Sequence, residues 1–435
     1  MLKSLKTKNF TIFSDAEIEF SPGLNVIIGE NNSGKSHLLK LAYTVAAIWY
    51  EAAAEHQNIP CKISSKGSKS WWQRRLAEKL VGIFKPDKLG HLFRRDGGRQ
   101  KAQIEAEIFS ATDQRLKFAF SSNTQKEVEI LQTPIEFPSA SPIFLPSKEV
   151  LSFYPGFVKL YDDRELTVDE TYPDLCKALS GFLLKGSKAK QYTTFIKPLE
   201  TIMGGQLKLK EGRFYLKPSG KKEMEISLVA EGLRKIGTLT YLAANGSLKN
   251  VLFWDEPEVD LNAKILTQLA SSLIELVEKY DMQVILATHS FFLMKELSVQ
   301  IEISKGNIPA QFMSLVPREA QVEQGGLLEE LATITVLDEI LAQDDRVQQL
   351  FCEGQLLSTE AQIKRYFTAK GKPLVQESDP ANSQQLKQLS KSSSHLKVTN
   401  MLPVFARTAV LNGFLTSKKT QIITVYSISI FFIPK

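Results

Sequence analysis

The stretch Gly29-Glu30-Asn31-Asn32-Ser33-Gly34-Lys35-Ser36 follows an apolar run at 24–28 and precedes a segment with helical spacing. Its two glycines let the backbone bend around a phosphate without a Cβ in the way. The backbone N–H groups of such a loop, and of the helix N-terminus behind it, face an anion. A glycine turn that carries Lys-Ser by chance is the alternative, but the strand–loop–helix setting favours a phosphate-binding loop. We predict that the nucleotide contacts come from Gly29, Asn31, Asn32, Ser33, Gly34, Lys35, Ser36 and His37.

A second stretch, Val251-Leu252-Phe253-Trp254-Asp255-Glu256-Pro257, supplies the acids that nucleotide hydrolysis needs. Four apolar residues predict a buried strand, and open α/β sheets bind ligands at the carboxyl ends of their strands. We predict that Asp255 and the hydroxyl of Ser36 hold Mg²⁺, while Lys35 reaches the β- and γ-phosphates of ATP. Glu256 is the predicted catalytic base for the attacking water. An ordinary strand exit with two acids is the alternative.

His289 follows the next apolar strand, Val284-Ile285-Leu286-Ala287-Thr288. A lone histidine is usually structural. Here it stands on the same predicted sheet edge as Asp255, in a βαβ arrangement, and imidazole changes charge near neutral pH. We therefore predict that His289 contacts the γ-phosphate and takes part in catalysis.

The composition is that of an ordinary soluble globular protein, with 43% hydrophobic and 23% charged residues in 435. Three widely spaced cysteines fit a reducing compartment without disulfide or zinc frameworks. The N-terminus lacks the apolar region of a signal peptide, and no apolar run approaches 18 residues. The sequence predicts a cytoplasmic protein with no membrane contact.

Positive charge is concentrated in two segments, although the net charge is only +6. Residues 62–101 carry twelve Lys/Arg against three acids, and residues 354–435 carry eleven against three. In the first, Trp71 and Trp72 stand beside Arg74 and Arg75, a pattern that can stack bases and contact phosphates. The alternative is an amphipathic helix that packs Trp72, Leu76, Leu80 and Ile83. DNA is a predicted partner through residues 62–101.

The sequence predicts that the chain is divided into six regions. Near the start, Leu5 to Phe13 and Ala16 to Phe20 have the composition of strands, and a hairpin is predicted around Glu211-Gly212. Residues 355–400 have few periodic faces. The predicted regions are an N-terminal part of an ATPase head (1–58), a basic insertion with antiparallel strands (59–140), a helical subdomain (141–225), a C-terminal part of the head (226–305), a helical extension (306–354) and a weakly ordered basic tail (355–435).

The combination of the phosphate loop, Asp255-Glu256-Pro257-Glu258 and Thr288-His289-Ser290 resembles the ABC-type AAA ATPases of the RecF, SMC and OLD-like group. It is also similar to the ATPase subunits of anti-phage systems of the Septu and PARIS type. The resemblance covers residues 1–58 and roughly 140–305. It implies an α/β fold, a P-loop NTPase with an ABC-type head: a mixed sheet flanked by helices, with inserted antiparallel strands and a helical subdomain.

The resemblance also implies roles for three further segments. Glu258 to Asn262 corresponds to the D-loop, and Ser147-Lys148-Glu149 is placed like the Q-loop, without its glutamine. Residues 229–235 correspond to the signature stretch, in which Gly232 and its neighbours meet the ATP of a second copy of the chain. A homodimer or higher homo-oligomer is therefore implied. Ala230 stands where the family has a serine, so a hydroxyl contact to the phosphate is missing, and Gly232 through its N–H, Arg234 or Lys235 could substitute for it.

Three function classes remain open from the sequence. The first is an ATPase (ATP + H₂O to ADP + phosphate) whose ATP-dependent dimerisation regulates DNA or a separate effector protein, in DNA repair or anti-phage defence. The second is a slow-turnover ATP-binding switch or scaffold for an effector. A nuclease is the third, but the paired acids after His289 (329–330, 338–339 and 344–345) lie on predicted helix rather than at strand ends.

Overall fold

A computed structural model describes most of the chain, including every predicted residue of the nucleotide site. The chain divides into two compact units, Met1–Ile334 and Thr335–Lys435. Among the described residues, no helix is both long and apolar enough to cross a bilayer. The described residues are 1–58, 65–94, 101–110, 112, 114–163, 166–316 and 322–352, with strands at 416–417, 420–425 and 429–434.

The first unit is built around a six-stranded sheet in the order β14-β13-β3-β12-β11-β7. All neighbouring pairs run parallel except β13 and β14. The strands are β3 (Leu24–Gly29), β7 (Ile143–Leu145), β11 (Val251–Asp255), β12 (Gln283–Thr288), β13 (Ala310–Leu315) and β14 (Val322–Gly325). This mixed sheet confirms the predicted fold class.

Both faces of the central sheet are covered, which explains why its parallel strands read as continuous apolar runs. Phe253 and Ile285 belong to one buried cluster with side chains of α1 (Lys35–Asn58), while Leu252 and Leu286, which alternate with them, are buried as well. The helix α8 (Ala263–Tyr280) contacts β3 and β12. The remaining helices of this part are α7 (Glu231–Ala244) and α9 (Phe291–Ile303).

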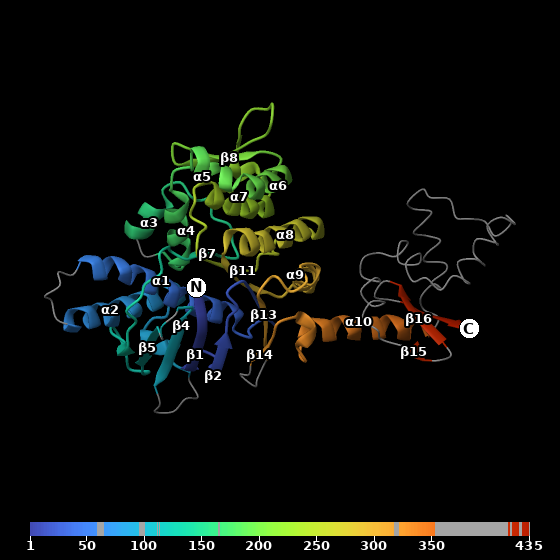
Figure 1. The fold of residues 1–435 in the computed structure, drawn as a ribbon, viewed down its shortest axis with the longest axis horizontal. Helices are drawn as coiled ribbons and strands as arrows, with labels where there is room; N and C mark the ends of the chain where they lie inside the picture. The colour runs from blue at the N-terminus through green and yellow to red at the C-terminus, as the bar shows by residue number, and fades with distance from the viewer. Residues whose placement is uncertain are drawn as a thin grey trace. The chain divides into compact units, whose positions relative to one another are not determined.

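An antiparallel sheet, in the order β2-β1-β4-β5-β6, joins the N-terminal strands to the insertion (Figure 1). The strand predicted from Leu5 to Phe13 ends earlier than expected, at Phe10. The chain turns back between Phe10 and Phe13, which pair with each other, and Thr11 adopts a left-handed φ of 49°. The strands are β1 (Leu2–Phe10), β2 (Phe13–Glu19), β4 (Ala102–Ile108), β5 (Arg115–Phe120) and β6 (Glu129–Gln132).

The insertion also contains α2 (Ser65–Phe84), followed by a short 3₁₀ helix at Leu89–Leu92. Its apolar face is the one that the amphipathic alternative predicts. Trp72, Leu76, Leu80 and Ile83 are all buried in the cluster shared with α1. Fully burying an aliphatic side chain of this size contributes roughly 1.5–3 kcal/mol. Trp72 is therefore a core residue.

A lobe of short helices and a small sheet lies between β7 and α7. Its hairpin confirms the prediction: Glu211 and Gly212 both have positive φ, 49° and 74°, as a two-residue turn between twisted strands requires. Its elements are α3 (Phe157–Asp163), α4 (Thr171–Leu179), α5 (Gly186–Gln191), α6 (Thr193–Met203), β8 (Gln206–Lys210), β9 (Arg213–Lys217), β10 (Met224–Glu225) and a 3₁₀ turn at Ile226–Leu228.

A buried cation connects three helices beside the central sheet. The ammonium of Lys79, on α2, lies 2.8 Å from Glu170 Oε1 and 2.6 Å from Asp174 Oδ2 of α4. Tyr43, on α1, donates its hydroxyl proton to the same Asp174 oxygen at 2.8 Å. Lys79 is 2% exposed, so its charge depends on these carboxylates for compensation.

Residues 306–354, predicted as a helical extension, begin with two strands. β13 lies directly beside β3, and β14 pairs with β13, so this segment completes one side of the central sheet. The helices of this segment are η3 (Leu328–Glu330) and α10 (Thr335–Cys352), and α10 opens the second unit.

The predicted weakly ordered tail, 355–435, lies mostly outside the described residues. Its described part is an antiparallel sheet in the order β15-β16-β17, formed by Thr416–Ser417, Thr420–Val425 and Ser429–Pro434.

Candidate nucleotide-binding site

The phosphate loop connects β3 to α1 and needs both of its glycines. Gly29 and Gly34 have φ angles of 151° and 93°. A Cβ on Gly29 would lie 2.7 Å from Ser33 Oγ, and one on Gly34 would lie 2.4 Å from Ile12 Cδ1. Because α1 begins at Lys35, its first N–H groups are those that a helix leaves without an internal partner. The loop is therefore shaped as an anion cradle.

Lys35 lies within this loop. Its ammonium donates to the carbonyl oxygens of Gly29 at 2.8 Å and Glu30 at 2.7 Å. Burial lowers the pKa of Lys35, and the nearby carboxylates of Glu256 and Asp255 oppose that shift. The cation thus stands between the loop and the two acids.

Ser36 and Asp255, far apart in sequence, meet at the end of β11. The Ser36 hydroxyl lies 3.1 Å from Asp255 Oδ1. Burial raises the pKa of Asp255 to about 6, while the Ser36 hydrogen bond lowers it. Mg²⁺ prefers oxygen ligands and is usually bound by one or two carboxylates together with substrate phosphates. A hydroxyl and a carboxylate beside a phosphate cradle fit that ion.

Glu256 occupies a strained position directly after β11. Its φ is +48°, which is unusual for a residue with a Cβ, and its N–H donates to Ala287 O at 2.9 Å. Such strain is held by surrounding structure and is concentrated at functional sites. Glu256 Oε1 lies 3.5 Å from His289 Nδ1, so the predicted base and the predicted γ-phosphate contact are neighbours.

Glu258 also belongs to the site, although the sequence predicts no role for it beyond the start of the D-loop. Its Oε1 accepts from the Thr288 hydroxyl at 2.7 Å and from the backbone N–H groups of His289 and Ser290 at 3.0 and 3.2 Å. The same oxygen lies 3.3 Å from His289 Nδ1. Glu258 Oε2 is buried with no hydrogen-bond partner. This carboxylate fixes the end of β12, and the second glutamate of Asp-Glu-Pro-Glu is the sequence signal for it.

Residues 229–235, which the resemblance compares with a signature stretch, lie against residues 259–261 of the same chain. A Cβ on Gly232 would come within 2.2 Å of Asp260 O. Lys235, which is buried, donates to Val259 O at 3.1 Å, and burial lowers its pKa. Arg234 Nε lies 3.2 Å from Glu149 Oε1, which links α7 to the segment placed like a Q-loop. Both cations considered as replacements for the signature serine are thus engaged within the same chain.

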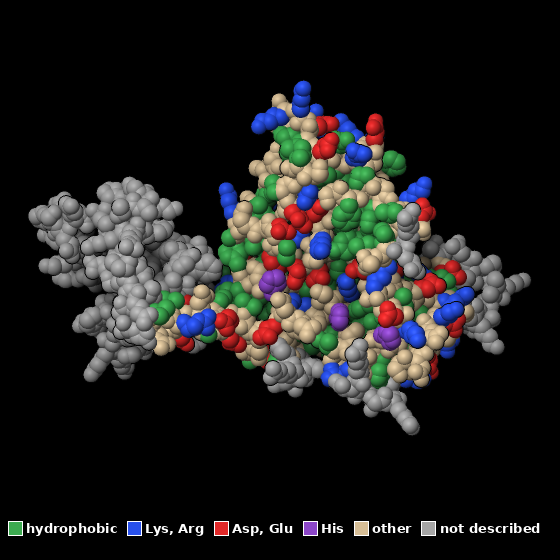
Figure 2. All heavy atoms as spheres, turned by 180° about the vertical axis from the view of Figure 1, so that it is seen from behind, with side chains coloured by type: hydrophobic (Ala, Val, Ile, Leu, Met, Phe, Trp, Pro, Cys, Tyr) green, Lys and Arg blue, Asp and Glu red, His purple; other side chains and the backbone are tan. Residues whose placement is uncertain are grey.

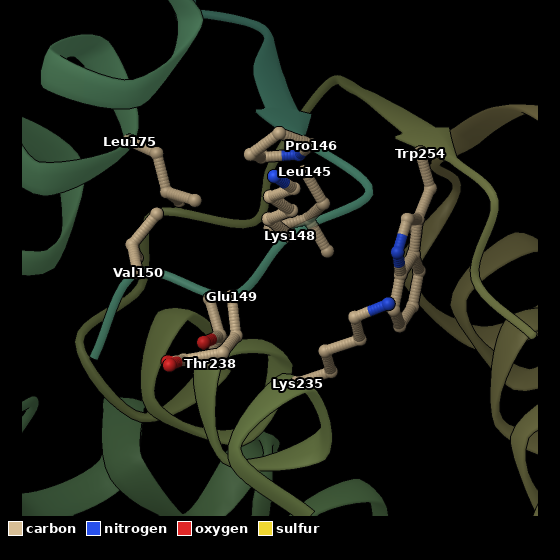
Figure 3. A pocket seen from close by; sticks show the side chains of 9 residues that line it. All are labelled: Leu145, Pro146, Lys148, Glu149, Val150, Leu175, Lys235, Thr238 and Trp254. Atoms are coloured by element: carbon tan, nitrogen blue, oxygen red, sulfur yellow. The ribbon is translucent and has the colours of Figure 1, made fainter. Parts of the chain in front are cut away.

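A small cavity of about 10 Å³ lies between Trp254 of β11 and the side chains of Lys235 and Thr238 on α7. Figure 3 shows Lys235 extending from α7 toward Trp254 of β11, with Lys148 and Glu149 on the other side. A space of this size holds about one water molecule. The cavity thus separates α7 from β11 but is too small for a nucleotide.

The other predicted contact residues have different surroundings. The ring of His37 packs edge-on against Phe84 of α2, with 5.7 Å between centroids. In the basic segment 62–101, Arg75 pairs with Glu51, and Lys79 is buried, so neither cation is exposed for a phosphate. Lys69 and Arg74 are exposed, and residues 95–100 lie outside the described residues.

Two family descriptions match parts of the chain. "AAA domain, putative AbiEii toxin, Type IV TA system" matches residues 158–295, and "AAA ATPase domain" matches residues 1–48. Together they contain the phosphate loop, Asp255, Glu256 and His289.

Curated relatives match over shorter stretches. The DNA double-strand break repair Rad50 ATPase of Archaeoglobus fulgidus is 40% identical over 67 residues, 15% of this chain and 7% of the relative. The DNA replication and repair protein RecF of Streptococcus gordonii is 47% identical over 45 residues, 10% of this chain and 12% of the relative. The matches thus span only about a tenth of the length of these relatives.

Solved structures of SMC heads overlap more of the chain at low identity. One, an SmcHead bound to the C-winged helix domain of ScpA, covers 75% of this chain and 98% of its own, with 12% identity and a TM-score of 0.46. An Smc head domain with an extended coiled coil, from Pyrococcus furiosus, covers 78% and 99%, with 12% identity and a TM-score of 0.47. The loop geometry, the strand-end acids and the two family matches together support an ABC-type AAA ATPase of the RecF/SMC-like group.

Proposed function

We propose that the protein binds and hydrolyses ATP and that ATP-dependent association of two heads regulates DNA or a separate effector protein. The observation that supports this most is the meeting of Ser36 and Asp255 at 3.1 Å, beside Lys35 and Glu256. These groups are the parts that phosphoryl transfer to water requires: a phosphate cradle, a cation, metal ligands and a base.

Catalysis in this proposal consists of positioning and charge neutralisation. The loop N–H groups and Lys35 hold the β- and γ-phosphates. Ser36 and Asp255 would hold Mg²⁺, which, when bound, supplies positive charge against the phosphate oxygens. Glu256 orients the attacking water and accepts its proton. His289, fixed by Glu258, contacts the γ-phosphate.

The proposed second half of the site comes from another copy of the chain, through Gly232 and its neighbours. Ala230 precedes α7 without a side-chain cap, so only backbone N–H groups are offered there. A slow-turnover ATP-binding switch, or a scaffold for an effector, is the second candidate. It is favoured by that missing hydroxyl and by the internal contacts of Arg234 and Lys235.

The biological setting is proposed from the relatives. Rad50 and RecF are described as repair proteins, which supports a role in DNA repair, whereas the longer family match carries a toxin–antitoxin description, which is closer to anti-phage defence of the Septu and PARIS type. A nuclease is less well supported. Glu329 pairs with Lys295 and Ser298, and Glu330 accepts from the N–H of Gly326.

The test is the Glu256→Gln variant, which keeps the side chain's shape but removes the base. Steady-state turnover should fall about 100-fold or more, because general-base catalysis contributes roughly 10²–10⁴. ATP should remain bound, and gel filtration with ATP should show a dimer. The control Glu278→Gln removes an exposed carboxylate from α8 and should hydrolyse ATP normally.

Lys35→Ala completes the test by weakening ATP binding itself. Turnover of Glu256→Gln at the wild-type rate would refute the assigned base. A protein that stays monomeric with ATP in every variant would refute the two-head arrangement. Slow wild-type turnover that DNA does not stimulate would favour the switch.

A further inference from the structure

The small sheet of the helical lobe has one apolar and one basic face. Phe214 and Leu216 of β9 are buried, as is Leu207 of β8, and these side chains turn toward the lobe. Strand alternation places the residues between them on the opposite face. That face carries Lys208 and Lys210 of β8, Arg213 and Lys217 of β9, with Gln206 and Tyr215 between them.

Like charges lie directly opposite each other on this face. Lys210 pairs in register with Arg213, an arrangement that destabilises a sheet. One carboxylate, Glu223, offsets part of it: it lies 2.6 Å from the ammonium of Lys210 and 3.9 Å from those of Lys208 and Lys217. Arg213, Lys221 and Lys222 are exposed. Positive charge therefore remains on this face beyond what Glu223 neutralises.

The segment around the hairpin carries as much net positive charge as the whole chain. Residues 185–225 carry ten Lys/Arg and four Glu, a net charge of +6, equal to that of all 435 residues. On α5 and α6, Lys188 and Lys197 are exposed as well. Figure 2 shows Lys and Arg side chains at the upper end of the molecule, where β8 and α5 lie in Figure 1. We name Lys208, Lys210, Arg213, Lys217, Lys221 and Lys222 the hairpin basic face.

We infer that the hairpin basic face binds the phosphate backbone of DNA. Interfaces between proteins are depleted in lysine and enriched in apolar and aromatic groups, whereas this face is mostly lysine, and its leucines and Phe214 turn inward. Residues two apart on a strand are about 6.8 Å from each other, close to the rise of two base pairs along the axis of a DNA duplex. The inference rests on the proposed function only in taking DNA as the partner.

The contacts are with phosphates, so the recognition is independent of base sequence. Each neutralised phosphate releases counterions and steepens the salt dependence of binding, with a slope of about −0.9 per contact on duplex DNA. Of the described cations in residues 62–101, Arg75 and Lys79 are paired internally. Lys69 and Arg74 of the same segment are exposed, so DNA contact there and DNA contact at the hairpin basic face are separate predictions.

The experiment measures binding of a fluorescent 30-base-pair duplex to the full chain by anisotropy, between 50 and 200 mM salt. The test variant combines Lys210→Gln, Arg213→Gln and Lys217→Gln. Its affinity should fall at least about tenfold, and its salt slope should become less negative by about 2.7 if each cation neutralises one phosphate. The control combines Lys126→Gln, Lys159→Gln and Lys249→Gln, exposed lysines outside segment 185–225, and should bind as the wild type does.

Nucleotide binding is measured on the same samples with a fluorescent ATP analogue, which separates the two proposals. Retained nucleotide binding with lost duplex binding supports the inference. A wild-type protein that binds nucleotide but no duplex, or that prefers an oligoglutamate peptide to the duplex, overturns the inference and leaves the ATPase proposal intact. Equal salt slopes for the test and control variants also overturn it. Duplex binding that depends on the hairpin without any nucleotide binding would refute the ATPase proposal instead.

Discussion

At the scale of single residues, Glu256 and Glu258 show how two neighbouring carboxylates have different surroundings. Glu256 is partly exposed on a strained turn, and its backbone N–H is bonded to Ala287 O. Glu258 is buried and accepts three hydrogen bonds from residues 288–290. The first is placed to meet a substrate, and the second holds the end of β12 together.

This difference predicts opposite effects of substitution. Glu258→Leu leaves the Thr288 hydroxyl and the His289 N–H without their acceptor, while the Ser290 N–H keeps the Thr288 oxygen, and this should cost about 2–4 kcal/mol in the free energy of unfolding. Glu258→Gln keeps an acceptor oxygen and should cost less. Urea denaturation measures both, with Glu256→Gln as the variant that loses turnover but keeps wild-type stability. Equal stability of the Leu and Gln variants would contradict the anchoring role.

At the scale of elements, the contact between α7 and the D-loop depends on a single glycine. Gly232→Ala would place a methyl group 2.2 Å from Asp260 O, so the helix and the loop must separate. Overpacking of this kind typically costs 1–3 kcal/mol. We expect a fall of about that size in the free energy of unfolding, together with weaker ATP-dependent dimerisation by gel filtration.

The same helix supplies the control. A methyl group on Gly237 would lie 3.3 Å from Met203 Sδ, the flexible part of a long side chain, and alanine is favoured over glycine in a helix by about 1 kcal/mol. Gly237→Ala should therefore be as stable as the wild type or more so. If both alanine variants behave alike, the close approach at Gly232 does not limit the packing.

The elements that could be predicted are those with a local signal. The glycines around Lys35, the apolar strand before Asp255 and the Glu211-Gly212 turn each determine their surroundings within a few residues. β13 was missed because its sequence, Ala-Gln-Phe-Met-Ser-Leu, is short and partly polar, and pairing with β3 stabilises it. The run Phe10-Thr11-Ile12-Phe13 has the composition of a strand, yet the chain reverses there.

The site could be predicted only in part for a related reason. Local residue types indicate the chemistry of four site residues: Lys35, Ser36, Asp255 and Glu256. The partners of Glu258 are 30–32 residues away, and no local pattern specifies such a contact. The basic hairpin was overlooked because two other segments carry a larger local excess of charge.

At the scale of the whole molecule, all residues of the nucleotide site belong to the unit that ends at Ile334. A fragment of residues 1–334 should therefore unfold cooperatively in urea and bind an ATP analogue with wild-type affinity. A shorter fragment, 1–304, lacks β13 and leaves one edge of β3 unpaired. We expect it to fail in both measurements, and equal behaviour of the two fragments would contradict the role of β13 in the sheet.

The buried ammonium of Lys79 couples α2 to α1, the helix that begins at the phosphate loop. α1 begins with Lys35. Farther along α1, Tyr43 bonds to Asp174 of α4, which also binds Lys79 of α2, and Glu51 pairs with Arg75 of α2. Any force that displaces α2 must either separate a cation from its carboxylates or move α1 and α4 with it. Because the pair is buried, salt screens it only weakly. Mechanical load on the insertion would thus reach the nucleotide without passing through the central sheet.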